Sequence, residues 1–394
     1  MRIWWKLLNI YLVLTLGLNI AMGSCFVSQI DDQSLGLKEY YQIATLNSAD
    51  DVQVVGNNAY VADFFTGVWI IDISDPANPI YKGRYFDGGE PHELVIDGNR
   101  AYVAEGKTGL VVIDITSSAN PMKLGQFYDN SVAAPQIAIA ISLDVVGNYA
   151  YVADGLDGLE IIDISDPANL TELGQFNDGG GANDVHVVGN FAYVADWALG
   201  LEIVNISDPM NPLEVNQYER PISHLHVSGD LAFVMGGHGA AGRLEILDIS
   251  DPNNLTILGS YADSGPAKDV YIVGNRAYVA DQTAGLKILD ISDLTNPTEL
   301  GHYNDGGEAS SVCVVNDIAY VADWEDGLEI IDVSDPSNPV ELGYYGGSVI
   351  PENTTTTTAT IEPTHLSTPG WTALFFLSGF MILIILQRSK RKRK

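Results

Sequence analysis

The string AYVAD and its near copies recur seven times in this chain at a nearly constant interval. The copies centre on Tyr60, Tyr102, Tyr151, Tyr193, Phe233, Tyr278 and Tyr320. Successive centres lie 42, 49, 42, 40, 45 and 42 residues apart. A period of about 40 residues, built from short apolar runs and turn residues, is typical of a β-propeller blade.

Each repeat divides into four short apolar runs. The copy from Asp184 to Tyr218 contains the runs DVHVV, FAYVAD, LEIVNIS and LEVNQY. Gly189-Asn190 separates the first two runs, and such a dipeptide favours a tight hairpin. An SDP step follows the third run, where the Asp side chain can close a turn and Pro stops the strand. Each repeat therefore predicts four antiparallel strands.

Seven such units predict an all-β fold, a seven-bladed β-propeller with four-stranded antiparallel blades. The alternative, an open β-solenoid, has shorter coils of about 20–30 residues. We expect the propeller over residues 38–346, with repeats near 51–86, 93–128, 142–176, 184–218, 224–261, 269–303 and 311–345. One further apolar run, Tyr40–Leu46, is placed to pair with the last blade and close the ring. Whether Val340–Tyr345 is then a fourth or a fifth strand stays open.

Two segments resemble a known repeat family. They are GLEIIDISDPANLTELGQF (Gly158–Phe176) and GLEIIDVSDPSNPVELGYY (Gly327–Tyr345), and both look like LVIVD repeats. The resemblance covers most of residues 40–346. It implies a seven-bladed propeller outside the cytoplasm, on a bacterial or archaeal surface protein, similar to YVTN-type and WD-repeat propellers. It brings no catalytic motif to this chain.

The N-terminus has the pattern of a secretory signal peptide, which we expect over residues 1–25. Arg2 and Lys6 precede a long apolar stretch that ends in small residues. Cys25 is either a lipid attachment residue or part of an ordinary cleavage region.

The C-terminus predicts a membrane anchor in three parts. Residues 347–370 are rich in Thr and Pro and read as an extended stalk. Residues 371–387 are apolar and predict either a transmembrane span or a cleaved sorting segment. The basic tail, residues 388–394, is expected in the cytoplasm by the positive-inside rule. We therefore expect a membrane-anchored protein at the cell surface, with the propeller outside.

The net charge of −32 excludes nucleic acid as a partner. Both chain ends carry basic residues and no acidic ones, so the segment between them is more negative still. The two cysteines cannot form a disulfide framework inside the propeller, because one lies in the leader. Expected partners are therefore a protein or glycan at the cell surface, or a cation.

An acidic residue ends the second strand in most repeats. This candidate rim comprises Asp63, Glu105, Asp154, Asp196, Asp281 and Asp323. One interpretation is structural, because a strand-end Asp accepts hydrogen bonds from loop N–H groups. The other is a negative rim that binds Ca²⁺ or a cationic partner through several oxygen ligands.

A second candidate site lies on the first strand, on the face that alternation turns toward the central channel. Its residues are Asp144, His186, His226 and Tyr271, with Asp184 and His224 two positions earlier on the same face. They could form a hydrogen-bonded polar cluster or a transition-metal site.

No HExxH, CxxC, Walker or Rossmann pattern is present. We therefore expect a non-catalytic binding scaffold for protein, glycan or cation, with Ca²⁺ or a transition metal as the conceivable cofactors. The alternative is an extracytoplasmic metal-dependent hydrolase or lyase with its site in the channel, which rests on fold-level analogy.

Overall fold

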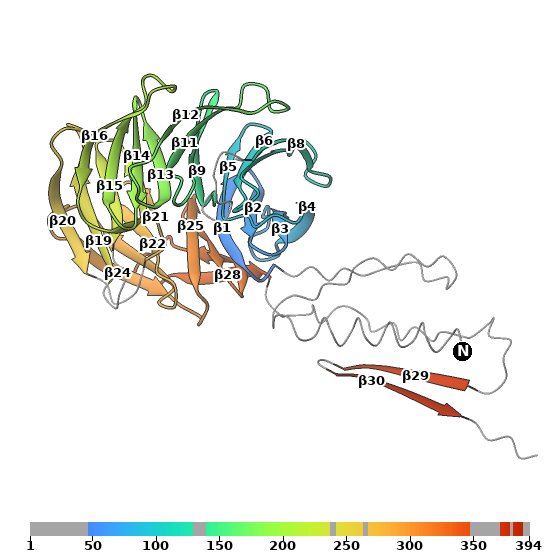
Figure 1. Ribbon diagram of the computed structural model, residues 1–394. Coiled ribbons are helices and arrows are strands. Elements are labelled where there is room, and N and C mark those ends of the chain that lie inside the picture. Colours follow the sequence, from blue (N-terminus) through green and yellow to red (C-terminus); the bar gives the residue numbers. More distant parts are fainter. Residues whose placement is uncertain are drawn as a thin grey trace, which may run out of the picture. The chain divides into compact units, whose positions relative to one another are not determined.

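Seven four-stranded antiparallel sheets follow one another along the chain, and their first strands surround a common centre (Figure 1). The computed structural model describes residues 46–128, 139–236, 242–262, 267–346, 371–378 and 381–388. All the named elements in these ranges are strands. The chain divides into two units, Met1–Ser348 and Val349–Lys394, and the propeller lies in the first.

The first blade contains β1 (Ala49–Val55), β2 (Asn58–Asp63), β3 (Gly67–Asp72) and β4 (Ile80–Tyr85). The second contains β5 (Glu93–Asp97), β6 (Arg100–Ala104), β7 (Leu110–Asp114) and β8 (Met122–Phe127). The third contains β9 (Ser142–Val146), β10 (Tyr149–Ala153), β11 (Leu159–Asp163) and β12 (Thr171–Phe176). The fourth contains β13 (Ala182–Val188), β14 (Phe191–Asp196), β15 (Gly200–Asn205) and β16 (Leu213–Tyr218).

The fifth blade contains β17 (Ile222–Ser228), β18 (Leu231–Gly236), β19 (Arg243–Asp248) and β20 (Thr256–Ala262). The sixth contains β21 (Asp269–Val273), β22 (Arg276–Ala280), β23 (Leu286–Asp290) and β24 (Thr298–Tyr303). The seventh contains β25 (Ala309–Val315), β26 (Ile318–Asp323), β27 (Gly327–Asp332) and β28 (Val340–Tyr345). The predicted seven-bladed propeller with four-stranded blades is thus confirmed.

The turns form where the sequence predicts them. Gly56 opens the first hairpin turn with a φ of 61°, and the last blade uses Asn316 and Asp317 instead, at 52° and 59°. These conformations suit glycine and, among other residues, Asn and Asp. In the turn between the third and fourth strands, the Asp75 carboxylate accepts from the Ala77 N–H at 3.2 Å. This is the Asx turn expected from the SDP step.

The hydrophobic core lies between blades. Each of seven buried clusters combines side chains of two neighbouring blades. The second and third strands are nearly continuous apolar runs because both of their faces pack against a neighbouring blade. Aliphatic burial between blades is therefore what holds the ring together.

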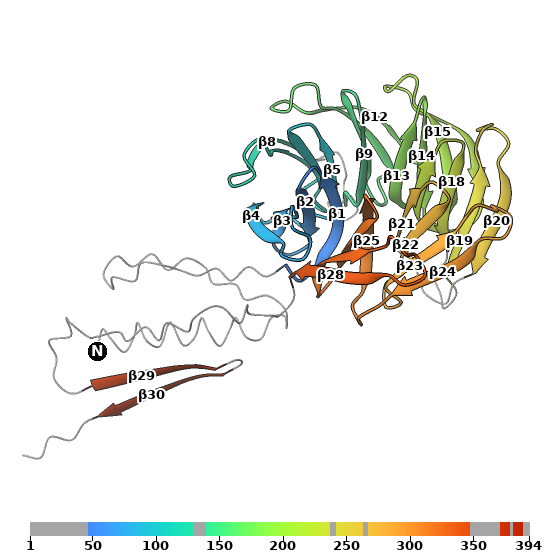
Figure 2. The ribbon, with the colours of Figure 1, turned by 180° about the vertical axis from the view of Figure 1, so that it is seen from behind.

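The ring closes between the first and last blades, where β1 contacts β25 (Figure 2). Ala49 and Trp324 form an isolated antiparallel bridge, and the Ser311 hydroxyl donates to Asp51 at 2.7 Å. The strand β28 pairs with β27 as the fourth strand of its own blade. The predicted closing strand Tyr40–Leu46 lies outside the described residues except for Leu46, which is buried against the seventh blade.

In the second unit, β29 (Trp371–Ser378) and β30 (Met381–Arg388) pair as antiparallel strands. Within the described ranges, no helix has the length and apolar character needed to cross a membrane. The expected span over 371–387 covers β29 and most of β30. The expected signal peptide, stalk and basic tail lie outside the described residues, except that Arg388 ends β30.

Candidate functional site

A cavity of about 460 Å³ occupies the centre of the ring, lined by the first strands of the blades. The alternation of β-strand side chains turns every second residue of these strands toward it. All the candidate channel residues line this cavity: Asp144, Asp184, His186, His224, His226 and Tyr271. The structure therefore places these six residues together at the central cavity, as predicted.

The rings of His186, His226 and Tyr271 lie next to one another in the cavity, each tilted relative to the next. The ring centroids of His186 and His226 lie 5.4 Å apart, and those of His226 and Tyr271 lie 6.0 Å apart. Burial lowers the pKa of His226 to about 4 and also lowers the pKa of His186, so both imidazoles are neutral near pH 7. Among the described residues, three acidic clusters have ligand atoms close enough to share a metal ion, and neither histidine belongs to one.

The carboxylates of the cavity bond to the backbone of the following blade. Asp184 accepts from the Leu225 N–H at 2.8 Å, and Asp144 accepts from the Val187 N–H at 2.7 Å. The Ser142 hydroxyl also donates to Asp184 at 2.7 Å. These side chains therefore connect neighbouring blades.

Sequence reasoning predicts only two of the polar residues at this position of the first strand, Asp184 and His224. A polar residue occupies the same position of the first strand in all seven blades: Asp51, Glu93, Ser142, Asp184, His224, Asp269 and Ser311. We call this set the polar belt. Asp51 accepts from the Leu94 N–H at 3.0 Å, and Asp269 accepts from the Val312 N–H at 2.9 Å. A sequence signal could have revealed the belt. In every repeat a polar residue lies two positions before the first-strand position that Asp144, His186, His226 and Tyr271 occupy.

Burial dominates the electrostatics of the belt. It raises the pKa of Asp51 and of Asp184 to about 7. It raises the pKa of Glu93 well above its usual value, with the charges of Asp184 and Asp51 adding to the effect. It lowers the pKa of His224 to about 3. Desolvation thus favours the neutral form of every one of these groups.

The six acidic strand ends lie beneath the surface rather than forming an exposed rim, because loop backbone covers them. None of these six residues is more than 3 % exposed. Asp63 accepts from four backbone N–H groups, those of Asn47, Ser48, Phe65 and Thr66, at 2.8–3.1 Å. Such a carboxylate fastens the loop to the strand end.

Comparison with known protein families matches the LVIVD repeat to seven consecutive segments. They cover residues 47–87, 88–129, 139–178, 179–220, 222–263, 264–305 and 306–346. The chain belongs to the LVIVD-repeat family. No curated protein matches it.

One solved structure shares the fold of this propeller at low sequence identity. The crystal structure of the computationally designed Ika8 protein is 10 % identical, with a TM-score of 0.56, covering 77 % of this chain and 89 % of the designed one. BamB from Moraxella catarrhalis is 12 % identical, with a TM-score of 0.48, covering 71 % of this chain and 80 % of BamB. The likeness to the designed protein concerns the fold alone.

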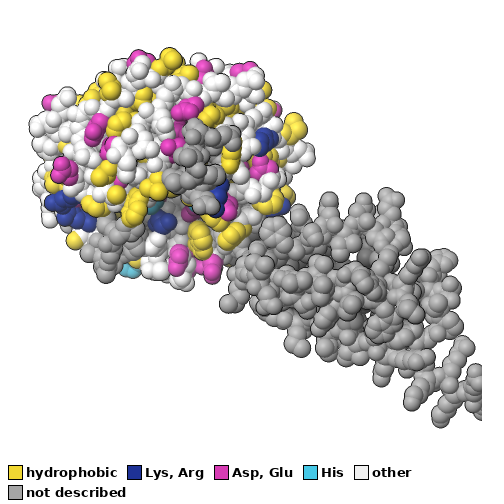
Figure 3. Space-filling model, viewed as in Figure 1, with side chains coloured by type: hydrophobic (Ala, Val, Ile, Leu, Met, Phe, Trp, Pro, Cys, Tyr) yellow, Lys and Arg dark blue, Asp and Glu magenta, His cyan; other side chains and the backbone are white. Residues whose placement is uncertain are grey.

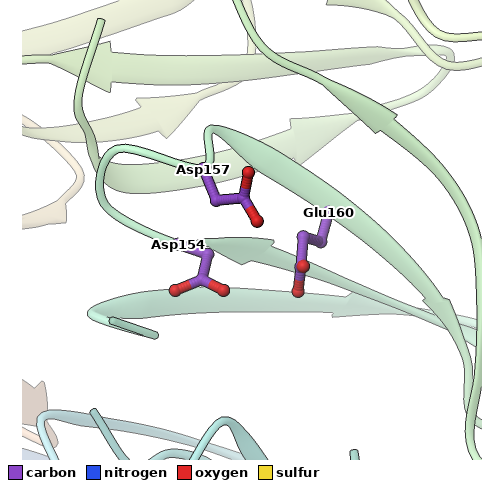
Figure 4. Close-up of side chains that lie close together, drawn as sticks. All are labelled: Asp154, Asp157 and Glu160. Carbon is purple, nitrogen blue, oxygen red and sulfur yellow. The ribbon is translucent and has the colours of Figure 1, made fainter. Parts of the chain in front are cut away.

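Clusters of three carboxylates, whose ligand atoms all lie within 4.8 Å of one another, occur at three places in the described part of the LVIVD propeller. Their members are Asp154, Asp157 and Glu160 in the third blade (Figure 4), Asp178, Asp196 and Glu202 in the fourth, and Asp305, Asp323 and Glu329 in the seventh. Each cluster joins a strand-end Asp to a Glu at the start of the third strand. Three of the predicted acidic residues thus have carboxylate neighbours that sequence reasoning missed.

Glycines let the chain approach the clusters of the fourth and seventh blades. A Cβ on Gly180 would overlap the Asp196 carboxylate, and one on Gly307 would overlap that of Asp323. Burial, with the neighbouring carboxylates adding, raises the pKa of Glu202 to about 9 and that of Asp323 to about 7. These buried groups resist ionisation unless a cation is near.

The two faces of the LVIVD propeller differ in composition. One, which we call the connection face, consists of the loops between second and third strands and the connections between blades. Its described ranges are 64–66, 86–92, 105–109, 139–141, 154–158, 177–181, 197–199, 219–221, 267–268, 281–285, 304–308 and 324–326, together with residues 128 and 242. The opposite face, the turn face, consists of the remaining turns within blades.

Exposed aromatic side chains gather on the connection face. Four of the six that the described residues expose lie there: Phe65, Phe86, Tyr128 and Trp197. The other two, Tyr81 and Tyr344, lie on fourth strands at the outside of the ring. On the side of the propeller seen in Figure 3, acidic side chains lie scattered among apolar ones.

Proposed function

We propose that this protein is a non-catalytic binding scaffold, held at the cell surface, whose connection face binds a positively charged segment of a partner protein. The observation that carries the proposal is the gathering of exposed aromatic residues on this face. Aromatic side chains are enriched where proteins bind one another, and their ring faces attract cationic groups.

The charge of the same face supports a basic partner. Its exposed acidic residues are Asp87, Glu90, Asp178, Glu219, Asp305, Glu308, Glu325 and Asp326. Exposed basic residues of the described part of this face are Lys107 and Arg220. A basic partner would meet both the negative field, which speeds encounter, and the aromatic rings, which stabilise the complex.

The bonding in the central cavity supports binding rather than catalysis. Asp144 and Asp184, the two carboxylates of the candidate channel group, already accept hydrogen bonds from a neighbouring blade. A general base needs a free acceptor within reach of its substrate. Polar groups that tie blades together serve the scaffold instead.

The test is the binding of a lysine- and arginine-rich peptide to the purified full chain, measured by fluorescence anisotropy. We expect saturable binding that weakens with salt, and roughly tenfold weaker binding after Phe65→Ser and Trp197→Ser are combined. The matched control combines Val188→Ser and Met210→Ser, exposed apolar residues outside the connection face. Equal loss in both double variants, or no binding by the wild type, would refute the proposal.

We further propose that residues 371–387 anchor the protein in a membrane, with the basic tail in the cytoplasm and the propeller outside. The support is the apolar segment followed by basic residues in the sequence. Expressed in its host, the full chain should sediment with membranes after a high-salt wash, and protease added to intact cells should remove the propeller. A chain stopped before Trp371 should be released. Membrane-free recovery of the full chain would contradict the anchor.

A further inference from the structure

The fourth and seventh blades contain the same acidic arrangement built from the same sequence pattern. Both connections begin with Asn-Asp-Gly-Gly, at 177–180 and 304–307. In each, the Asp is followed by a second Asp 18 residues later and by a Glu six residues after that. The first Asp is exposed and the other two carboxyl groups are buried. The cluster therefore opens to solvent on one side only.

One buried oxygen in each cluster has no hydrogen-bond partner among the described residues. In the fourth blade this atom is Oε1 of Glu202, a residue 3 % exposed. In the seventh blade it is Oδ1 of Asp323, a residue 2 % exposed. An orphaned buried acceptor of this kind costs about 1–3 kcal/mol, more when charged, unless a ligand supplies the missing contact.

Within each cluster the buried Glu also contacts the exposed Asp. Glu202 lies in hydrogen-bond contact with Asp178, and Glu329 lies in the same contact with Asp305. Two carboxylates can approach this closely only with a proton or a cation between them. Since each cluster holds three carboxyl groups, a single proton leaves most of the charge uncompensated.

Other blades contain a cationic side chain at the corresponding place. In the sixth blade, Lys287 replaces the Glu of the third strand and forms an ion pair with Asp281. In the fifth blade, Glu245 pairs with Arg220 at 2.9 Å and with Arg243.

The second blade follows the same rule. Its connection contains Asp87-Gly88-Gly89, and the Asp87 carboxylate pairs with Lys123 at 3.0 Å. Within the described residues, no Lys or Arg pairs with the clusters of the fourth and seventh blades. At these two clusters an external cation would take the place that a Lys or Arg side chain has in the second, fifth and sixth blades.

We propose that the fourth and seventh blades each bind one Ca²⁺ ion, held by Asp178, Asp196 and Glu202 in one case and by Asp305, Asp323 and Glu329 in the other. The ligands are all hard oxygen donors, without His or Cys, which suits Ca²⁺ rather than a transition metal. Three carboxylates supply up to six oxygens, and solvent can complete the shell on the open side. This inference shares Asp178 and Asp305 with the proposed surface for a basic partner, but it does not rest on the binding of that partner.

The test uses Tb³⁺, which replaces Ca²⁺ and luminesces when a nearby indole is excited. Trp197 directly follows Asp196, and Trp324 directly follows Asp323. On the full chain stripped with chelator, we expect indole-sensitised Tb³⁺ luminescence that Ca²⁺ displaces, with Ca²⁺ affinity on the order of 10⁻⁴–10⁻³ M, as in extracellular modules. Glu202→Gln and Glu329→Gln should each remove about half of the signal, and the double variant most of it.

The matched control is Glu245→Gln, at the same position of the fifth blade, which should leave the signal and the Ca²⁺ displacement unchanged. Urea unfolding in chelator checks the fold: Glu202→Gln should be at least as stable as the wild type, because Gln preserves the size of the side chain and removes one of three crowded carboxyl groups. Absence of Ca²⁺-displaceable luminescence in the wild type would overturn the proposal. So would a folded double variant that retains the wild-type signal.

Discussion

A buried carboxyl group in this protein has one of three environments. Asp63 is surrounded by backbone N–H donors, and Asp281 is paired with a lysine. Asp184 accepts hydrogen bonds yet lies deep in the ring, where burial raises its pKa to about 7. The sequence shows where a carboxyl group occurs, whereas the neighbours that decide its charge depend on how loops, strands and blades pack around it.

At the level of single residues, the stability of the protein should depend on pH through Asp184. Its folded-state pKa, about 7, exceeds the ordinary value of 3.8. The stabilisation linked to its protonation is therefore complete below pH 3.8 and is lost as the pH rises through 7. Between pH 5 and 7 each such group lowers the free energy of unfolding by about 1.4 kcal/mol per pH unit. Asp184→Asn should therefore gain stability relative to the wild type from pH 5 to pH 8.

Urea unfolding of both proteins at pH 5, 6, 7 and 8 measures this difference. The buried histidines, whose lowered pKa values act in the opposite direction, are present in both chains and cancel. Asp163→Asn is the control, because this carboxylate at the end of β11 has a lowered pKa and does not titrate in this window. If the free energies of unfolding of the wild type and Asp184→Asn differ by the same amount at every pH, the prediction is wrong.

At the level of elements, the fourth strand of nearly every blade contains a glycine that faces the next blade. These residues are Gly83, Gly125, Gly174, Gly259, Gly301 and Gly343. A Cβ at any of them would overlap a backbone carbonyl oxygen in the turn of the following blade. In the fourth blade Asn216 takes this place, and its side chain donates to the Pro252 carbonyl at 3.0 Å. The backbone of each fourth strand therefore packs directly against a turn of the next blade.

Gly125→Ala should accordingly destabilise the ring by about 1–3 kcal/mol, the usual cost of overpacking. The added methyl group would collide with the carbonyl oxygen of Pro167, a backbone atom that cannot rotate away. Chemical denaturation measures the change. Leu124→Ala on the same strand, at a side chain 36 % exposed, should change the free energy of unfolding by less than about 0.5 kcal/mol. Similar effects of the two substitutions would contradict this account.

Elements of the fold were predictable because each repeat carries its own turns. Gly-Asn and Ser-Asp-Pro steps mark the ends of the strands locally, independently of how the blades pack together. Ring closure was harder to predict, because the sequence offers an eighth outer-strand pattern at Tyr40–Leu46. The pairing of β28 with β27 shows that Val340–Tyr345 is the fourth strand of the last blade.

At the level of the whole molecule, the candidate sites were only partly predictable. Strand alternation places His186 and His226 at the cavity, as expected. Asp178 and Asp305 were missed, because a connection's position over the next blade's strands is a tertiary property. The recurrence of identical spacings in two repeats is the sequence signal that could have indicated them.

The closing contact joins the two ends of the ring, since Ser311 bonds to Asp51 across 260 residues of chain. During synthesis β1 leaves the ribosome long before β25 exists. Until then Val52 and Ala49, which are buried at this interface, have no partner blade to cover them. Such late, long-range contacts slow folding and leave apolar surface exposed. The nascent first blade is thus where a chaperone would be needed longest.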